Sequence, residues 1–137
     1  MWKYYALLSA FFAAITALLS KVGVKGISGN TAVAVRCLVI VLIAWGIVFF
    51  SGQTKEIRHL SKSNILFLVL SGIATGLSWI FYFKALETGE VSKVAPLDKL
   101  SVVFTMILAV VFLKESLTPQ VVVGGLLIMA GAIVLAS

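Results

Sequence analysis

The sequence predicts an all-α membrane protein with five transmembrane helices, and three observations support this fold class. Of the 137 residues, 61% are hydrophobic and 12% are charged, and the mean hydropathy is +1.16. Soluble domains carry about 25% charged residues, so most of this surface is expected to face lipid. Five runs approach the 20 or so apolar residues that a spanning helix needs. They are residues 4–22, 31–50, 64–86, 92–113 and 119–135, which we take as one transmembrane domain over 1–137.

Composition also excludes several function classes. The formal net charge is +6, but the basic residues flank apolar runs instead of forming a stripe, which suits lipid headgroups and argues against a nucleic-acid partner. The single cysteine, Cys37, excludes an internal disulfide and a zinc cluster. No paired carboxylates, metal-ligand cluster or nucleophile with a base converge in the spans, so we expect no enzyme activity, metal or cofactor. No glycine-rich phosphate loop supports ATP-driven pumping.

The first span, 4–22, carries alanines at helical spacing, which lets another helix approach closely. A cleaved signal peptide that starts at Lys3 is the alternative. Against it, the apolar run is long, no clean cleavage pattern precedes Lys21, and four more spans follow. The connection after this span offers Ser28 or Asn30 as the cap of the next helix.

The second span, 31–50, contains Arg36 more than one turn inside its start. Its side chain either reaches back to the headgroups or turns inward to an anion, and its position slightly favours the headgroups. The loop that follows, 51–63, is the most polar in the chain. Its His59, the only histidine, is expected to be a solvated loop residue and not a ligand.

The third span, 64–86, contains Gly72 and Gly76 in the GxxxG spacing that favours helix packing. Trp79 and Tyr82 follow on the same helix. Aromatic residues near the end of a span form an interfacial belt or line a pocket, and both interpretations stay open here.

The fourth span, 92–113, is unusual because it holds Asp98 and Lys99. Charged residues inside a span are costly in hydrocarbon and usually face a bundle interior or a watery cavity. Asp98, Ser101 and Thr105 fall at i, i+3 and i+7, so they form a polar stripe on one helix face. Lys99 points about 100° away, so we expect it to reach the headgroups while Asp98 faces inward.

Arg36, Lys84 and Asp98 are expected near one face of the membrane, because successive connections alternate sides. At 1.5 Å per residue, Asp98 lies roughly 6–10 Å below the start of its helix. Three charges at one depth indicate a polar vestibule, although a structural ion pair of Asp98 with Lys99, Arg36 or Lys84 is the alternative. The candidate substrate or proton site comprises Asp98, Arg36, Ser101, Thr105, Tyr82, Trp79 and Lys84.

The fifth span, 119–135, begins with a strong start signal, Thr118 as the cap and Pro119 at the first helical position. It has no charged residue. Gly124 and Gly131 recur seven residues apart on one face, so this helix is expected to pack against another helix.

Basic residues are distributed almost evenly between the two sides of the membrane, five against four to six. The positive-inside rule therefore assigns no clear orientation, which is compatible with a chain that inserts both ways up and also with one orientation set by the basic loop 51–63. One side holds Lys3, Lys55, Arg58, Lys62 and Lys114, and the other holds Lys21, Lys25, Lys84 and Lys93, with Arg36 and Lys99 shallow on that side.

Residues Tyr82–Ser137 resemble the EamA family of the drug/metabolite transporter superfamily. The matching features are Lys84-Ala85-Leu86 at the end of one span, Pro96 and Leu100-Ser101 in the next, Lys114-Glu115 at the turn, and Gly124-Gly125 with Gly131 in the last span. The five spans equal one repeat of that family.

The resemblance implies a transporter that moves small organic solutes, often outward, by alternating access. Family members usually carry two such repeats of opposite topology, so a five-helix unit is expected to pair with itself or with a sister subunit in an antiparallel arrangement. The even charge distribution agrees with that. We therefore expect a secondary transporter of small organic metabolites or drugs that lies in the plasma membrane of a bacterium. The alternative is a non-transporting assembly or regulatory subunit.

The chain departs from the family pattern at two places. Val102 stands where proline often follows the Leu-Ser step, so the residue that would kink the fourth span is missing. The related four-helix multidrug exporters use a glutamate in their first helix, but no acid occurs between Tyr4 and Ser20. Asp98 is therefore the only acid well inside a span that is available for proton coupling.

Overall fold

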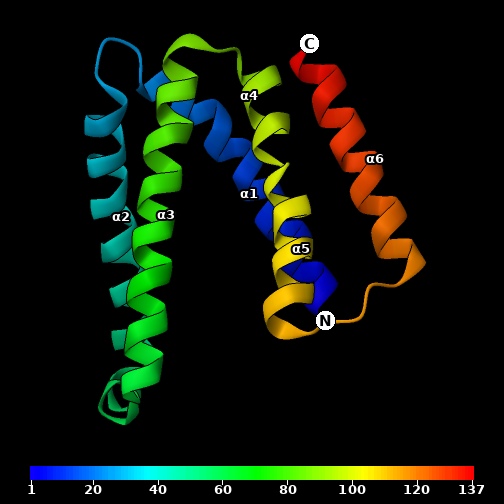
Figure 1. The fold of residues 1–137 in the computed structure, drawn as a ribbon. Helices are drawn as coiled ribbons and strands as arrows, with labels where there is room; N and C mark the ends of the chain where they lie inside the picture. Colours follow the sequence, from blue (N-terminus) through cyan, green and yellow to red (C-terminus); the bar gives the residue numbers. More distant parts are fainter. The chain divides into compact units, whose positions relative to one another are not determined.

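The computed structural model describes residues 1–137, and they form helices with no β-strand. The predicted all-α class with five membrane-crossing segments is confirmed, because five segments are long and apolar enough to cross a bilayer. The helices are α1 (Trp2–Gly23), α2 (Gly29–Phe50), α3 (Lys62–Thr88), α4 (Val91–Asp98), α5 (Ser101–Leu113) and α6 (Pro119–Ala136), and the 3-10 helix η1 (Gln53–His59) lies between α2 and α3 (Figure 1). The fourth crossing segment is α4 and α5 together.

Two compact units make up the chain. The α2–α3 unit is Ser20–Glu87, and the α4–α6 unit is Met1–Leu19 with Thr88–Ser137. Large apolar side chains such as Leu38, Phe67 and Phe104 are more than half exposed along the helices. Such surfaces suit lipid, in which the helices satisfy their own backbone hydrogen bonds.

In the α2–α3 unit, α2 and α3 approach each other most closely at the start of α2. Ser28 caps that helix, because its Oγ accepts a hydrogen bond from the Thr31 N–H at 3.3 Å. Gly29 then lies against α3: a Cβ at this position would be 3.1 Å from the Phe83 carbonyl carbon. Phe83 and Leu86 are 2% and 0% exposed, so this contact is the best-buried part of the chain.

Two charged side chains hold the same junction together. The Glu87 carboxylate accepts a hydrogen bond from the Gly29 N–H, and the Lys21 ammonium donates one to the Leu86 carbonyl. An acid thus lies at the N-terminus of α2 and a base at the C-terminus of α3. Both arrangements complement the helix dipoles. The last turn of α1, the start of α2 and the end of α3 therefore meet at one place.

In the α4–α6 unit, the fourth span is interrupted between α4 and α5. The amides of Lys99 and Leu100 bond to the carbonyls of Pro96 and Leu97, three residues back instead of four, at 3.0 Å each. Pro96 lacks an N–H and removes a further α-helical bond from this segment. The span is thus not one regular helix, although position 102 is a valine and not the proline that would kink the span further along.

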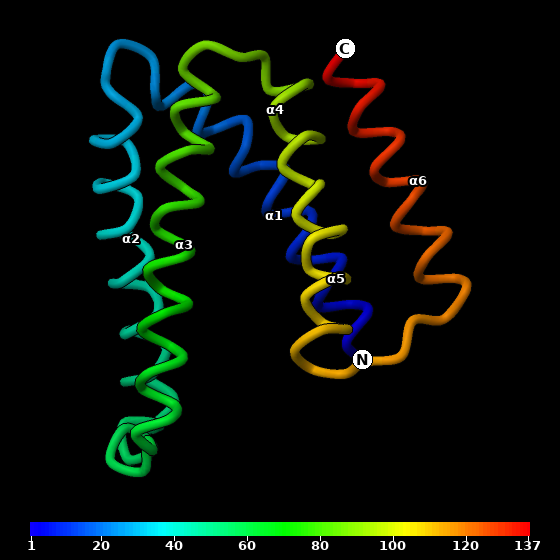
Figure 2. The backbone as a smooth tube through the Cα atoms, viewed as in Figure 1, coloured from blue at the N-terminus to red at the C-terminus, as the bar shows by residue number.

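The chain then turns through residues 114–118 and returns as α6, which packs against α4 and α5 (Figure 2). Lys114 ends α5 in the left-handed conformation, with φ of 55°. Thr118 caps α6 as predicted, since its side chain accepts a hydrogen bond from the Val121 N–H. Gly125 makes the close contact of this hairpin: a Cβ there would be 2.8 Å from the Met106 sulfur.

The four glycines expected to pack against helices lie in open space within their own units. A Cβ at Gly72, Gly76, Gly124 or Gly131 would have no neighbour within 4 Å. The close helix contacts in the structure are made by Gly29 and Gly125 instead. A packing role for the four predicted glycines therefore stays a prediction.

Candidate functional site

The α2–α3 unit places Arg36 against two aromatic rings of α3. Arg36 lies seven residues into α2 from Gly29, about 10 Å along the axis. Because α3 runs antiparallel to α2 from their junction at Phe83, Arg36 lies alongside the α3 residues before Phe83, and its long side chain reaches the rings of both Trp79 and Phe83. The Arg36 guanidinium carbon is 4.5 Å from the centroid of the Trp79 ring system and 5.6 Å from that of the Phe83 ring. Both distances are within the range of attractive cation–π contacts.

This contact fixes where Arg36 points. The arginine and Trp79 are half-buried and Phe83 is buried, so the guanidinium lies on α3. The structure thus brings together two residues of the predicted site, Arg36 and Trp79. It adds Phe83, which is not among the predicted site residues.

The Arg36 guanidinium has no acidic partner. It makes no hydrogen bond and no ion pair within the chain. Glu87, the acid nearest to it along α3, is bound to the Gly29 N–H more than one turn away. A charged side chain inside a spanning helix usually pairs with an opposite charge or lines a polar cavity. Arg36 therefore remains a cation with unused donors.

Tyr82 and Lys84 occupy different surroundings on α3. The half-buried Tyr82 ring lies edge-on to Phe83, with 6.3 Å between the centroids. Lys84 is exposed and, five residues after Trp79, lies about 140° around the helix from it. Tyr82 therefore borders the Arg36 cluster, by which we mean Arg36, Trp79 and Phe83, whereas Lys84 does not join it.

Asp98 lies at the interruption between α4 and α5. Its Oδ2 is 3.7 Å from the Lys99 ammonium, and the Asp98 and Lys99 side chains are 40% and 57% exposed. The long lysine side chain thus turns back to Asp98, although the two residues point about 100° apart on a regular helix. Exposed pairs of this kind contribute little to stability. This ion pair is one of the alternatives that the sequence left open.

The backbone at the interruption offers further polar groups. The Val102 N–H bonds to the Lys99 carbonyl at 3.0 Å, so the Asp98 carbonyl lacks its α-helical partner. Side chains three residues apart align in a 3-10 turn, which keeps Asp98 and Ser101 on one side. The Thr105 hydroxyl donates to the Ser101 carbonyl at 2.8 Å. Asp98 belongs to the other unit from Arg36 and Lys84, so their common vestibule stays a prediction.

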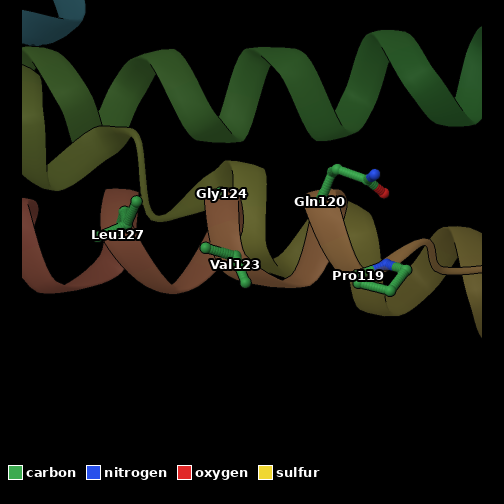
Figure 3. A pocket seen from close by; sticks show the side chains of 5 residues that line it. All are labelled: Pro119, Gln120, Val123, Gly124 and Leu127. Atoms are coloured by element: carbon green, nitrogen blue, oxygen red, sulfur yellow. The ribbon is translucent and has the colours of Figure 1, made fainter.

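Neither a pocket nor a metal cluster identifies a further site. A shallow groove is lined only by residues of α6, and its polar side chain is Gln120 (Figure 3). No group of three or more His, Cys, Asp or Glu side chains comes together. The polar features suited to a solute are therefore the Arg36 cluster and the interruption at Asp98.

Comparison with known proteins gives the family. The model of the EamA-like transporter family matches residues 1–137. This chain belongs to that family. It is a multi-pass membrane protein of a transporter family, and the resemblance based on Tyr82–Ser137 extends over the whole chain.

Two curated proteins illustrate the relationship. An "uncharacterized transporter in cobO 3'region" from a Sinorhizobium species is 46% identical over 135 residues, which are 98% of this chain and 96% of that protein. An uncharacterized protein of Methanocaldococcus jannaschii is 28% identical over 101 residues, 74% of this chain and 66% of that protein. No solved structure matches the chain.

Proposed function

We propose that this EamA-family chain is half of a secondary transporter that exports small organic metabolites or drugs by alternating access. Two copies, or one copy and a sister subunit, form the complete transporter in the cell membrane. Two features support this: family membership, and a curated relative of almost the same length that is named as a transporter. In this proposal residues 1–137 act as one domain, and Gly72, Gly76, Gly124 and Gly131, which are open in each unit, pack against the partner.

The interruption of the fourth span at Asp98 carries the proposal. Transporter sites are typically built where a spanning helix is discontinuous, because unpaired backbone groups and an embedded charge then face the solute. Here the Asp98 carbonyl has lost its helical partner, and the Asp98 side chain forms an ion pair with its neighbour Lys99. Asp98 accordingly binds the substrate or a coupling proton, with Ser101 and Thr105 on the same helix.

One observation favours the alternative of a non-transporting subunit. The 3.7 Å contact between Asp98 and Lys99 gives the aspartate a structural partner, and such a subunit would need nothing more from it. The two functions predict different consequences when the charge of Asp98 is removed.

The experiment is transport into proteoliposomes with the Asp98→Asn variant. A solute is first selected by screening amino acids, nucleosides and cationic drugs against the parent protein under an imposed proton gradient. We expect Asp98→Asn to abolish gradient-driven uptake while the protein remains folded and paired, and Glu115→Gln, at the turn after α5, to leave uptake unchanged. Unchanged uptake in Asp98→Asn would refute the role of Asp98. Loss of folded protein would favour the structural ion pair.

A further inference from the structure

The Arg36 cluster, defined as Arg36, Trp79 and Phe83, has the features of a ligand site that lacks its ligand. The guanidinium is half-buried and held by two rings, one of them 98% buried, so its position is largely set in advance. Ordering a long side chain before binding lowers the entropy that a ligand must overcome. None of the five N–H donors of Arg36 is used within the chain.

We propose that the Arg36 cluster binds the carboxylate or phosphate group of an organic ligand. A guanidinium presents paired donors that match the two oxygens of such a group, which a lysine ammonium does not. The rings contact the cation and leave it able to bind an anion, and the half-buried Trp79 ring also provides an apolar surface for the remainder of the ligand.

The charge pattern also excludes a cationic ligand at this place. Aromatic clusters that bind cations offer their ring faces to the ligand. Here the faces of Trp79 and Phe83 are already near the Arg36 guanidinium, and no carboxylate neutralises it. If the ligand is the transported solute, this inference rests on the proposed transport function. In that case it restricts the transported substrates to acids and zwitterions.

The same oxyanion chemistry is available from two sources. A soluble organic acid or phosphate ester provides it, and so does the phosphate of a lipid headgroup. Arg36 lies about 10 Å from the start of α2, a depth that a long side chain can bridge toward either source. The source must therefore be decided by experiment.

Fluorescence of Trp79 reports binding directly. The full chain carries Trp2, Trp45 and Trp79, so a Trp2→Phe/Trp45→Phe background leaves Trp79 as the only indole. In dodecyl maltoside, benzoate and phenyl phosphate are expected to change its emission saturably, whereas benzylamine is not. Arg36→Gln should weaken anion binding at least tenfold, Arg36→Lys should weaken it less, and Arg58→Gln, in exposed η1, should leave it unchanged. Circular dichroism verifies that each variant is folded, and Arg36→Lys keeps the test usable if Arg36→Gln is not.

Occupation of the Arg36 cluster by a phospholipid headgroup is tested by measuring the phosphorus content of the purified protein. If a headgroup occupies the cluster, the parent retains about one phospholipid per chain, Arg36→Gln retains none, and soluble anions displace the lipid. The inference is overturned if Arg36 variants bind anions as the parent does, if benzylamine binds as well as benzoate, or if neither anions nor lipid depend on Arg36. Binding is measured without a gradient. If the protein binds anions but shows no uptake, the result counts against the transport function alone. If uptake occurs, is unchanged in the Arg36 variants, and no anion binding is detected, the result counts against this site alone.

Discussion

Replacing Gly29 by alanine should destabilise the α2–α3 unit, because the helix junction has no room for a side chain. A Cβ at Gly29 would lie 3.1 Å from the Phe83 carbonyl carbon, 3.2 Å from its Cβ and 2.6 Å from a Glu87 carboxylate oxygen. The glutamate can move, but then the Gly29 N–H loses a charged acceptor, worth about 1.5–3 kcal/mol. The α3 backbone cannot move without disturbing buried Leu86. Overpacking of this kind costs about 1–3 kcal/mol.

Gly46→Ala is the matched control on the same helix. A Cβ at Gly46 would meet nothing within 4 Å. Alanine is favoured over glycine inside a helix by about 1 kcal/mol, so this variant should be as stable as the parent or more so. Gly29→Ala has a similar propensity gain at most, which is smaller than its combined losses. We therefore expect Gly29→Ala to be less stable than Gly46→Ala by about 2 kcal/mol or more.

The assay uses Cys37, the only cysteine, which lies half-buried in α2. A thiol-reactive fluorophore labels it as the unit opens on heating in detergent, so the labelling midpoint follows stability. Gly29→Ala should label at a lower temperature than the parent and Gly46→Ala should not. If Gly29→Ala labels at the same temperature as Gly46→Ala or higher, the close approach of α2 and α3 at Gly29 is wrong.

Two further predictions concern the interrupted span and the assembly. Pro96→Ala adds the N–H that α4 lacks, so we expect slower amide hydrogen exchange across residues 96–100 and slower uptake; unchanged exchange would show that Pro96 does not maintain the interruption. For an antiparallel homodimer, a tag at the C-terminus should be reachable from both sides of sealed cells, and a tag found on one side only would exclude that arrangement.

The Arg36 cluster shows which part of the site could be predicted from the sequence. An arginine inside an apolar span is visible in the sequence and indicates a polar site. The orientation of its side chain cannot be read from the sequence, because the position of Arg36 is compatible both with headgroups, which it slightly favours, and with an inward anion. The decision depends on Trp79 and Phe83, more than 40 residues away along the chain, whose rings come within reach of the Arg36 side chain because α2 and α3 are antiparallel.

The junction at Gly29 could have been suspected from two signals. Gly29 follows directly on the cap Ser28, and Glu87 lies at the end of α3, the next spanning helix along the chain. The GxxxG spacing instead predicted helix packing at Gly72 and Gly76. Spacing shows that two glycines share a face of their own helix, but not that any other helix lies on that face.

The sequence by itself determined the fold class, the five crossing segments and the cap Thr118, and it narrowed the cap of α2 to Ser28 or Asn30. These features depend on the hydropathy of single segments and on hydrogen bonds over three residues, which are local properties of the chain. Only the tertiary structure decided that Gly29 and Gly125 make the close contacts, that Glu87 binds the start of α2, and that Arg36 lies on aromatic rings. Such pairings depend on the register and rotation of one helix against another, which are set by side-chain packing between segments distant in the sequence.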